Sequence, residues 1–106
     1  DVRIEGASLS EAAAAAHEFA ASRSAVFLHP FDDPLVIAGQ GTVAVEMLQQ
    51  VPALDTLVVP VGGGGLCAGI ATYVKYVRPE IKIFAVEADD SACLAAAMAA
   101  GRRVGV

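Results

Sequence analysis

The sequence predicts an α/β fold in which helices flank a parallel β-sheet, and three observations support this prediction. Two short apolar runs, Thr56–Val61 and Lys82–Glu87, are typical of buried strands. Segments with a helical spacing of apolar residues follow these runs, and a helix between two strands is the usual way of returning the chain for parallel pairing. Four consecutive glycines, Gly62–Gly65, stand directly between the first run and its helix.

The remaining elements follow from capping residues, apolar runs and turn residues. Ser8 and Glu11 form a capping box, which predicts a helix that continues to about Ser22. Asp33–Pro34 is the cap and first-turn pattern of a second helix. The further expected elements, in chain order, are strands at 2–5 and 25–28, helices at about 35–50 and 66–77, and a final helix that Asp90 or Ser91 caps and Gly101 closes.

The composition argues against several function classes. A chain of 106 residues with 56% hydrophobic and 18% charged residues is suited to one packed α/β segment, residues 1–106. The net charge is −5 and no basic run occurs, so we expect neither nucleic acid nor a membrane as a partner. The apolar stretches are also too short to span a bilayer.

The cysteines and the chain ends lead to further expectations. Cys67 and Cys93 lack the spacing of metal ligands, and we expect reduced thiols packed as small hydrophobic side chains. Reduced thiols, together with an N-terminus unlike a signal peptide, predict a cytoplasmic protein. Residues 102–106 contain no terminal element, so we expect a chain cut from something longer.

The glycine run predicts an anion site. Glycine lets the backbone adopt a positive φ and approach a ligand closely, and the first amides of the following helix have no partner within the helix. A phosphate group fits these amides and the positive end of the helix dipole. A P-loop for ATP or GTP is not expected, because Leu66 and Cys67 stand where its lysine is needed. A tight turn without a ligand is the alternative, which the entropy cost of four glycines disfavours.

A dinucleotide site is a second interpretation of the same loop. Gly63, Gly65 and Ala68 fit the loose G-x-G-x-x-A pattern. Glu87 lies 24 residues after Gly63, where an acidic side chain would bind a ribose. The pattern is weak, since residues 39–44 match it as well. Spacing alone therefore leaves the identity of the phosphate ligand open.

Three stretches, taken together, resemble one enzyme family. Residues 29–42 contain His-Pro-Phe-Asp-Asp-Pro and Val-Ile-Ala-Gly-Gln-Gly-Thr, residues 59–69 contain Val-Pro-Val-Gly-Gly-Gly-Gly-Leu, and residues 86–94 read Val-Glu-Ala-Asp-Asp-Ser-Ala-Cys-Leu. This ordered set resembles the threonine dehydratase and serine racemase family, whose cofactor is pyridoxal 5'-phosphate (PLP). The last stretch resembles the biosynthetic threonine dehydratase branch. The likeness runs nearly end to end and is weakest over residues 1–24.

The resemblance implies part of the fold type II PLP-enzyme fold, a three-layer αβα arrangement. Such enzymes act on a small-molecule amino-acid substrate: they remove ammonia from L-threonine or L-serine, giving 2-oxobutanoate, a precursor in isoleucine biosynthesis, or pyruvate. We also expect a homo-oligomer. Backbone amides of the glycine loop would bind the PLP phosphate, and Phe31 would lie near the cofactor or substrate. The implied cofactor-binding residues are Gly62, Gly63, Gly64, Gly65 and Leu66.

The chain departs from the family where catalysis is concerned. The family's Schiff-base lysine belongs to a Ser-x-Lys-x-Arg-Gly-Ala-type segment, and neither Lys75 nor Lys82, expected as solvated surface lysines, follows that pattern. No regulatory region is present either. The divalent metal of serine racemases is not expected, because Glu87 matches its first ligand but Ala92 stands where an aspartate is needed. We therefore predict no catalytic residue in these 106 residues, and no activity of the chain by itself.

The two histidines differ in their expected surroundings. His17 is expected to be an ordinary helix residue, whereas His29 follows a predicted strand beside the expected site. We favour a structural hydrogen-bonding role for His29 over acid–base chemistry, because no nucleophile is paired with it.

Three hypotheses for the function remain open. They are a PLP phosphate-loop segment of a threonine dehydratase, a dinucleotide-binding domain of an oxidoreductase, and a non-catalytic α/β fragment that self-associates.

Overall fold

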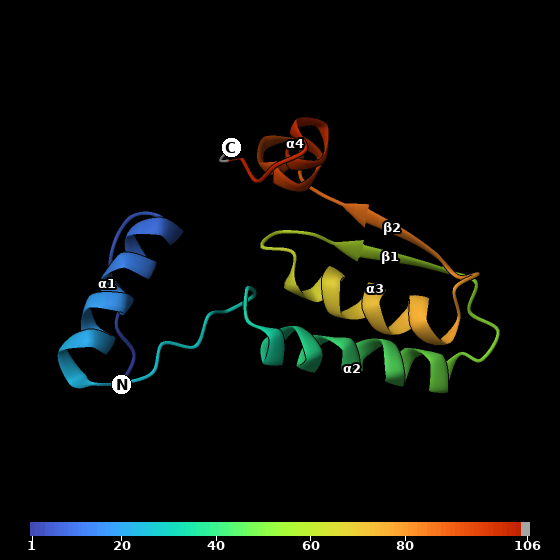
Figure 1. Cartoon of the computed structure of the whole chain (residues 1–106), viewed down its shortest axis with the longest axis horizontal. Coiled ribbons are helices and arrows are strands. Elements are labelled where there is room, and N and C mark those ends of the chain that lie inside the picture. The colour runs from blue at the N-terminus through green and yellow to red at the C-terminus, as the bar shows by residue number, and fades with distance from the viewer. Residues whose placement is uncertain (105–106) are drawn as a thin grey trace.

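The computed structural model describes residues 1–104, and its elements alternate as the sequence predicts over the middle of the chain (Figure 1). Residues 105–106, the end of the segment for which no element is predicted, lie outside the described residues. The elements are α1 (Leu9–Arg23), α2 (Pro34–Gln50), β1 (Thr56–Pro60), α3 (Gly65–Val77), β2 (Lys82–Val86), the 3₁₀ turn η1 (Asp89–Ser91) and α4 (Cys93–Ala100).

The two strands form a parallel pair, with Thr56 opposite Lys82 and Pro60 opposite Val86. α3 makes the crossover between them, and it lies between the sheet and α2 in Figure 1. This arrangement confirms the predicted α/β fold with a parallel sheet and flanking helices. Because the strands are parallel, their carboxyl ends lie at the same end of the sheet. The glycine turn follows β1 there, and the segment leading to α4 follows β2.

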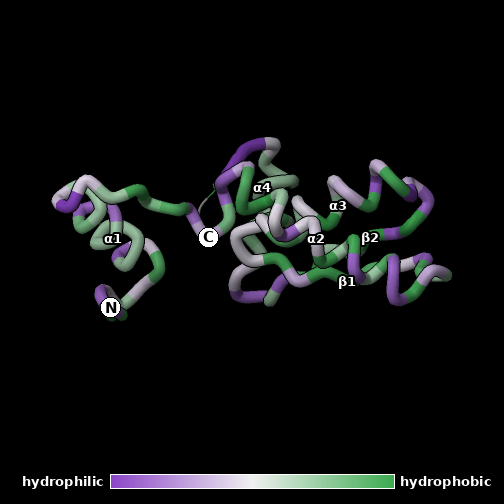
Figure 2. The backbone as a smooth tube through the Cα atoms, turned by 90° about the horizontal axis from the view of Figure 1, so that it is seen from below, coloured by the Kyte–Doolittle hydropathy of each residue, from purple (hydrophilic) through white to green (hydrophobic). Residues whose placement is uncertain are grey.

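The core lies between the sheet and the two helices. Leu57 and Val59 on β1 are buried, whereas Val58 between them is 66% exposed, as expected from the two-residue repeat of a strand. The tube is coloured hydrophobic along most of both strands in Figure 2. Within residues 1–104, α3 covers one face of the sheet and α2 packs on α3, whereas the opposite face of the sheet is open. The core cluster consists of Ala44, Leu57, Val59, Ile70, Val74 and Ile81.

Two glycines let α2 and α3 approach each other closely. A Cβ built on Gly69 would lie 2.7 Å from the backbone nitrogen of Gly41, and it would also overlap the carbonyl oxygen of Ile37. A Cβ on Gly41 would lie 3.1 Å from the carbonyl oxygen of Gly69. The two helix backbones are therefore in direct contact. This contact fixes the first half of α3, and with it the glycine turn, against the first half of α2.

The strands predicted at 2–5 and 25–28 are wrong: both segments are extended or irregular chain without strand pairing. Their apolar side chains are largely exposed, with Ile4 at 94% and Val26 at 84%. A strand requires a neighbour to satisfy its backbone groups, and among residues 1–104 no strand lies beside either segment. Both runs are apolar, but within residues 1–104 no strand is available to pair with them.

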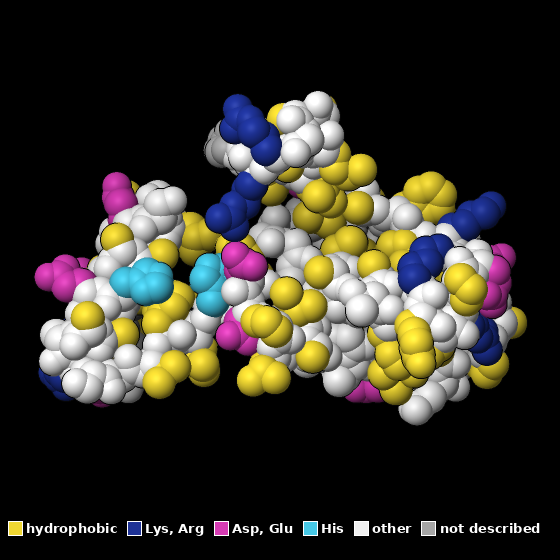
Figure 3. Space-filling view, in the orientation of Figure 1, with side chains coloured by type: hydrophobic (Ala, Val, Ile, Leu, Met, Phe, Trp, Pro, Cys, Tyr) yellow, Lys and Arg dark blue, Asp and Glu magenta, His cyan; other side chains and the backbone are white. Residues whose placement is uncertain are grey.

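α1 stands apart from the other helices and is joined to them by residues 24–33 (Figure 1). The predicted capping box is present: the amide of Glu11 donates to Ser8 Oγ over 3.3 Å, and the amide of Ala7 donates to Glu11 Oε2 over 2.6 Å. The molecule is elongated, 49 × 30 × 22 Å. Figure 3 shows the two histidine side chains close together where α1 faces the connecting segment.

The cap of the last helix differs from the prediction. α4 starts at Cys93 with Ala92 as its cap residue, because Asp89–Ser91 forms a separate 3₁₀ turn closed by the amide of Ser91 on the carbonyl of Ala88. Gly101 closes α4 as predicted, with φ +64°. None of the helices within residues 1–104 has the length and hydropathy needed to cross a membrane.

Candidate phosphate-binding site

The glycine turn places free amides at the start of α3. Gly64 caps the helix with φ +90°, a conformation that residues with a Cβ rarely adopt. The first helical hydrogen bond runs from the amide of Ala68 to the carbonyl of Gly64, 2.8 Å. The amides before Ala68 therefore have no carbonyl within the helix to bond to, and they point out of its N-terminal end. This is the arrangement that binds anions at helix starts.

Phe31 packs directly on this turn. A Cβ on Gly63 would overlap the Phe31 ring, and a Cβ on Gly65 would lie 2.7 Å from the carbonyl oxygen of Phe31. Both positions must therefore be glycine for this packing. At Gly62 and Gly64 a Cβ would meet nothing within 4 Å, so these two residues face open space.

A cavity of about 400 Å³ opens beside the turn. It brings together all of the residues that the sequence analysis proposes for the site, although they come from two distant parts of the chain. Its lining consists of Pro30, Phe31, Gln40, Pro60, Val61, Gly62, Gly63, Gly64, Gly65 and Leu66.

The segment that carries Phe31 is held by His29. The ring nitrogen Nδ1 of His29 accepts from the amides of Asp32, 2.8 Å, and Phe31, 3.3 Å. The rings of His29 and Phe31 meet edge to face with their centroids 4.6 Å apart. Asp33 then caps α2 by accepting from the amides of Leu35 and Val36. His29 thus has the structural hydrogen-bonding role that the sequence analysis favours.

The carboxylate of Glu87 caps the start of α4. Its Oε1 accepts from the amide of Leu94, 2.7 Å, and its Oε2 from the amide of Ala95, 2.9 Å. These two donors, Leu94 first, hold the pKa of Glu87 below its usual value. A carboxylate that caps the next helix is not directed at a ribose in the glycine turn, so the geometry does not favour the dinucleotide interpretation.

The structure adds two residues to the surroundings of the turn that the sequence analysis did not place there. The thiol of Cys93 donates to the carbonyl of Gly62 over 3.4 Å, and Arg103 lines a cavity of about 330 Å³ between the turn and α4. Arg103 also forms an exposed ion pair with Asp32, 3.3 Å, which contributes little to stability. No local sequence signal indicates these neighbours, because they lie about thirty residues or more from the turn.

Both lysines lie far from the glycine turn. Lys82 pairs with Thr56 at the start of the sheet, whereas the turn follows its other end. Lys75 is in the last turn of α3, where its Nζ donates to the carbonyls of Pro79 and Ile81. Lys75 is exposed, as the sequence predicts, and its two hydrogen bonds hold the loop that follows α3. Within residues 1–104, no lysine faces the candidate site.

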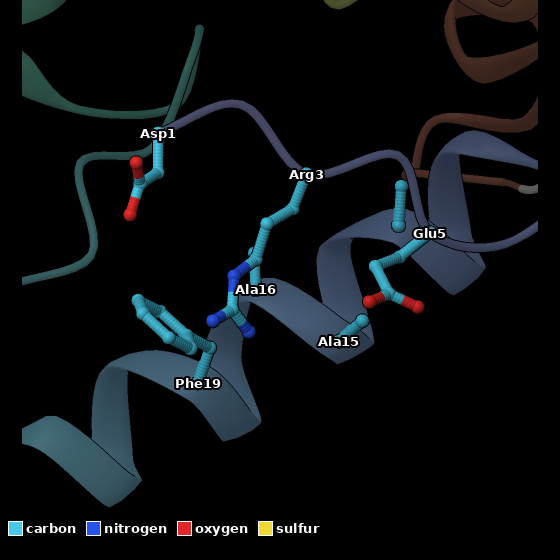
Figure 4. Close-up of a pocket in the computed structure, with 7 residues that line it drawn as sticks. Asp1, Arg3, Glu5, Ala15, Ala16 and Phe19 are labelled. Atoms are coloured by element: carbon cyan, nitrogen blue, oxygen red, sulfur yellow. The ribbon is translucent and has the colours of Figure 1, made fainter.

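Another pocket, of about 270 Å³, lies between the N-terminal segment and α1 (Figure 4). Arg3 reaches over the ring of Phe19, with the guanidinium carbon 4.3 Å from the ring centroid. Asp1 and Glu5, which lie two residues before and after Arg3, are exposed. This grouping is a cation–π contact at the surface, and it holds neither a nucleophile nor a general base paired with one.

Comparison with known proteins places these features in a family. The family described as "Pyridoxal-phosphate dependent enzyme" matches residues 1–106. The biosynthetic L-threonine dehydratase IlvA of Salmonella typhimurium is 54% identical over 104 residues, 98% of this chain, and that of Escherichia coli is 53% identical. The serine racemase of Bos taurus is 59% identical over 68 residues. The chain spans about one fifth of the length of these relatives, 20% in each case.

Solved structures agree with the sequence comparison. The processed form of threonine deaminase isoform 2 from Solanum lycopersicum superposes on the whole chain with a TM-score of 0.91 at 39% identity. Maize serine racemase does so with a TM-score of 0.90 at 35% identity. The chain covers 31% and 32% of these two proteins.

Proposed function

Because this chain belongs to the family of pyridoxal-phosphate dependent enzymes, we propose that its glycine turn holds the phosphate of PLP. The free amides at the start of α3, among them those of Gly65 and Leu66, supply hydrogen-bond donors, and the helix dipole supplies a positive potential. The packing of Phe31 against Gly63 and Gly65 keeps the turn in one shape. The residues proposed to bind the phosphate are Gly62, Gly63, Gly64, Gly65 and Leu66.

We propose further that the whole protein is a threonine dehydratase that releases ammonia from L-threonine and gives 2-oxobutanoate, as a step towards isoleucine. The support is the 54% identity over nearly the entire chain to a biosynthetic L-threonine dehydratase. The cofactor would supply an electron-withdrawing ring that stabilises negative charge at the substrate Cα. This segment would bind and orient the phosphate. Phe31 lines the cavity in which the phosphate would lie.

The location and assembly of the whole protein are part of the same proposal. Cys67 and Cys93 are free thiols in the structure, which supports a reducing, cytoplasmic compartment. The open face of the sheet supports association with further protein, either the remainder of the enzyme or a second copy.

Phosphate binding is tested with 4'-deoxypyridoxine 5'-phosphate, which has no aldehyde to react with Lys75 or Lys82. The amide resonances of residues 62–66 are expected to shift on titration with this compound, and inorganic phosphate is expected to compete with it. Pyridoxine, which lacks the phosphate, is the matched control and is expected to leave the resonances in place. Equal shifts with pyridoxine would contradict a phosphate site.

We predict that the 106-residue chain releases no 2-oxobutanoate from L-threonine in the presence of PLP. The reason is that Lys82 lies at the far end of the sheet and Lys75 donates to the loop after α3, so neither reaches the glycine turn. The measurement is a coupled assay for 2-oxobutanoate against a protein-free sample containing PLP. Product formation above that background that persists in a Lys75→Arg, Lys82→Arg double variant would contradict the prediction.

A further inference from the structure

The shape of the glycine turn depends on the segment 29–32. Both the backbone and the ring of Phe31 contact the turn, since a Cβ on Gly65 would lie within 2.9 Å of the Cα and Cβ of Phe31, and a Cβ on Gly63 would overlap its ring. The turn itself has four glycines and therefore a large conformational freedom when nothing restrains it. Phe31 is a restraint that reaches it from outside the β1–α3 unit.

A single atom, Nδ1 of His29, holds Phe31 in this position. It accepts from two successive amides, those of Phe31 at 3.3 Å and Asp32 at 2.8 Å, and so closes a tight turn. A ring nitrogen accepts hydrogen bonds only when it is unprotonated, so this geometry requires the proton on Nε2. The His29 ring also lies between Phe31, at 4.6 Å, and Phe27, at 6.1 Å.

We infer that His29 is a positioning residue for the phosphate site: its Nδ1 sets the 29–32 turn, which seats Phe31 on Gly63 and Gly65 and preorganises the amides that bind phosphate. The inference rests on the proposed function, since it assigns His29 a part in the same site. His29 does not line the cavity beside the turn and acts through Phe31. Preorganisation of this kind raises affinity by lowering the entropy lost on binding.

Two substitutions at this position separate the acceptor from the ring. His29→Asn keeps an acceptor atom close to the place of Nδ1, in a side chain that commonly accepts from the amides two and three residues ahead. His29→Phe keeps an aromatic ring against Phe31 and removes the acceptor. His17→Phe is the matched control, because His17 stacks on Phe27 with centroids 3.9 Å apart, one ring further from the turn.

The experiment measures the full 106-residue chain in each form by NMR. We expect His29→Phe to weaken the binding of 4'-deoxypyridoxine 5'-phosphate about tenfold, as for the loss of two modest hydrogen bonds, and to speed amide exchange of Phe31 and Asp32. His29→Asn and His17→Phe are expected to bind within about threefold of the original chain. In the original chain, the ring nitrogen resonances of His29 are expected to show the Nε2–H form.

The outcomes also separate this inference from the proposed function. Unchanged exchange of Phe31 and Asp32 in His29→Phe, or a His29 ring in the Nδ1–H form, would overturn the inference even if the phosphate binds as proposed. A His29→Asn variant that binds as weakly as His29→Phe would overturn it as well. Failure of the original chain to bind the phosphate compound would instead refute the proposed function, while the exchange and ring measurements still decide the role of His29.

Discussion

Gly62 and Gly65 belong to one run of four glycines, yet their surroundings differ. A Cβ at position 62 would meet nothing within 4 Å, whereas a Cβ at position 65 would press on the backbone of Phe31 at 2.7 Å. Backbone atoms cannot turn aside as the end of a flexible side chain can. An alanine at position 62 therefore adds a methyl group without a clash, whereas an alanine at position 65 also displaces Phe31 from the glycine turn.

We predict that Gly65→Ala destabilises the chain by about 1–3 kcal/mol and abolishes phosphate binding at the turn, because the start of α3 and Phe31 must move apart. Gly62→Ala, the matched control, is expected to change the free energy of unfolding by less than about 0.5 kcal/mol. Urea unfolding and titration with inorganic phosphate measure the two effects. Equal stability and binding in the two variants would show that Phe31 does not shape the turn.

For single residues, the sequence predicts the glycine turn better than it predicts the positions of Phe31 and Glu87 around the turn. Four glycines after an apolar run are a local signal, and they indicate the free amides directly. The seat of Phe31 on Gly63 and Gly65 depends on packing between segments more than thirty residues apart, so only the family resemblance indicated it. The sequence spacing of Glu87 favoured a ribose-binding role, because nothing in the spacing shows that its carboxylate turns towards α4.

Glycines also act at the level of whole helices, where α2 and α3 touch. We predict that Gly69→Ala destabilises the chain by about 1–3 kcal/mol, since its Cβ would meet the backbone of α2 at Gly41 and Ile37. Gly39→Ala, on the same helix pair but with nothing within 4 Å, is expected to stabilise by about 0.5–1 kcal/mol through its better helix propensity. Urea unfolding measures both, and a stabilised Gly69→Ala chain would contradict the close contact.

The start of α4 is predicted to depend on pH through Glu87. The folded state lowers the pKa of this carboxyl, so its capping contribution is complete above the unfolded pKa of about 4.3 and is lost as the pH falls through the lower folded value. The amide resonances of Leu94 and Ala95 are expected to titrate together, at a pH below the ordinary range of a glutamate carboxyl. In Glu87→Gln they are expected not to titrate. Titration of these amides in Glu87→Gln would assign the effect to another group.

The elements that the sequence predicts incorrectly share one cause. Residues 2–5 and 25–28 have strand-like apolar residues, but strand formation depends on a neighbour that residues 1–104 do not contain. The helices and the β1–β2 pair, in contrast, are specified within one local unit of strand, crossover and strand. Local patterns are sufficient for such a unit, whereas strands of a wider sheet require partners from more distant sequence.

The same lack of partners affects the surface of the whole molecule. The sheet described here has two strands, and each therefore has one edge without hydrogen-bonded neighbours. On the face away from the helices, Val58, Phe84 and Val86 are 66%, 55% and 50% exposed. Figure 3 shows hydrophobic side chains gathered around the sheet. Open strand edges beside exposed apolar side chains are a template for pairing with another chain.

We therefore predict that the 106-residue chain self-associates through the open face and edges of its sheet. The net charge of −5 favours solubility, but Lys82 is the one charged residue within the two strands. Sedimentation at increasing protein concentration is expected to show dimers or larger species, with a melting temperature that rises with concentration.

A Val58→Lys, Phe84→Lys double variant is expected to shift the chain towards monomer. Leu35→Lys, which places a charge at an exposed position on α2, is the control and is expected to leave association unchanged. A monomer at all concentrations, with a melting temperature independent of concentration, would refute the prediction.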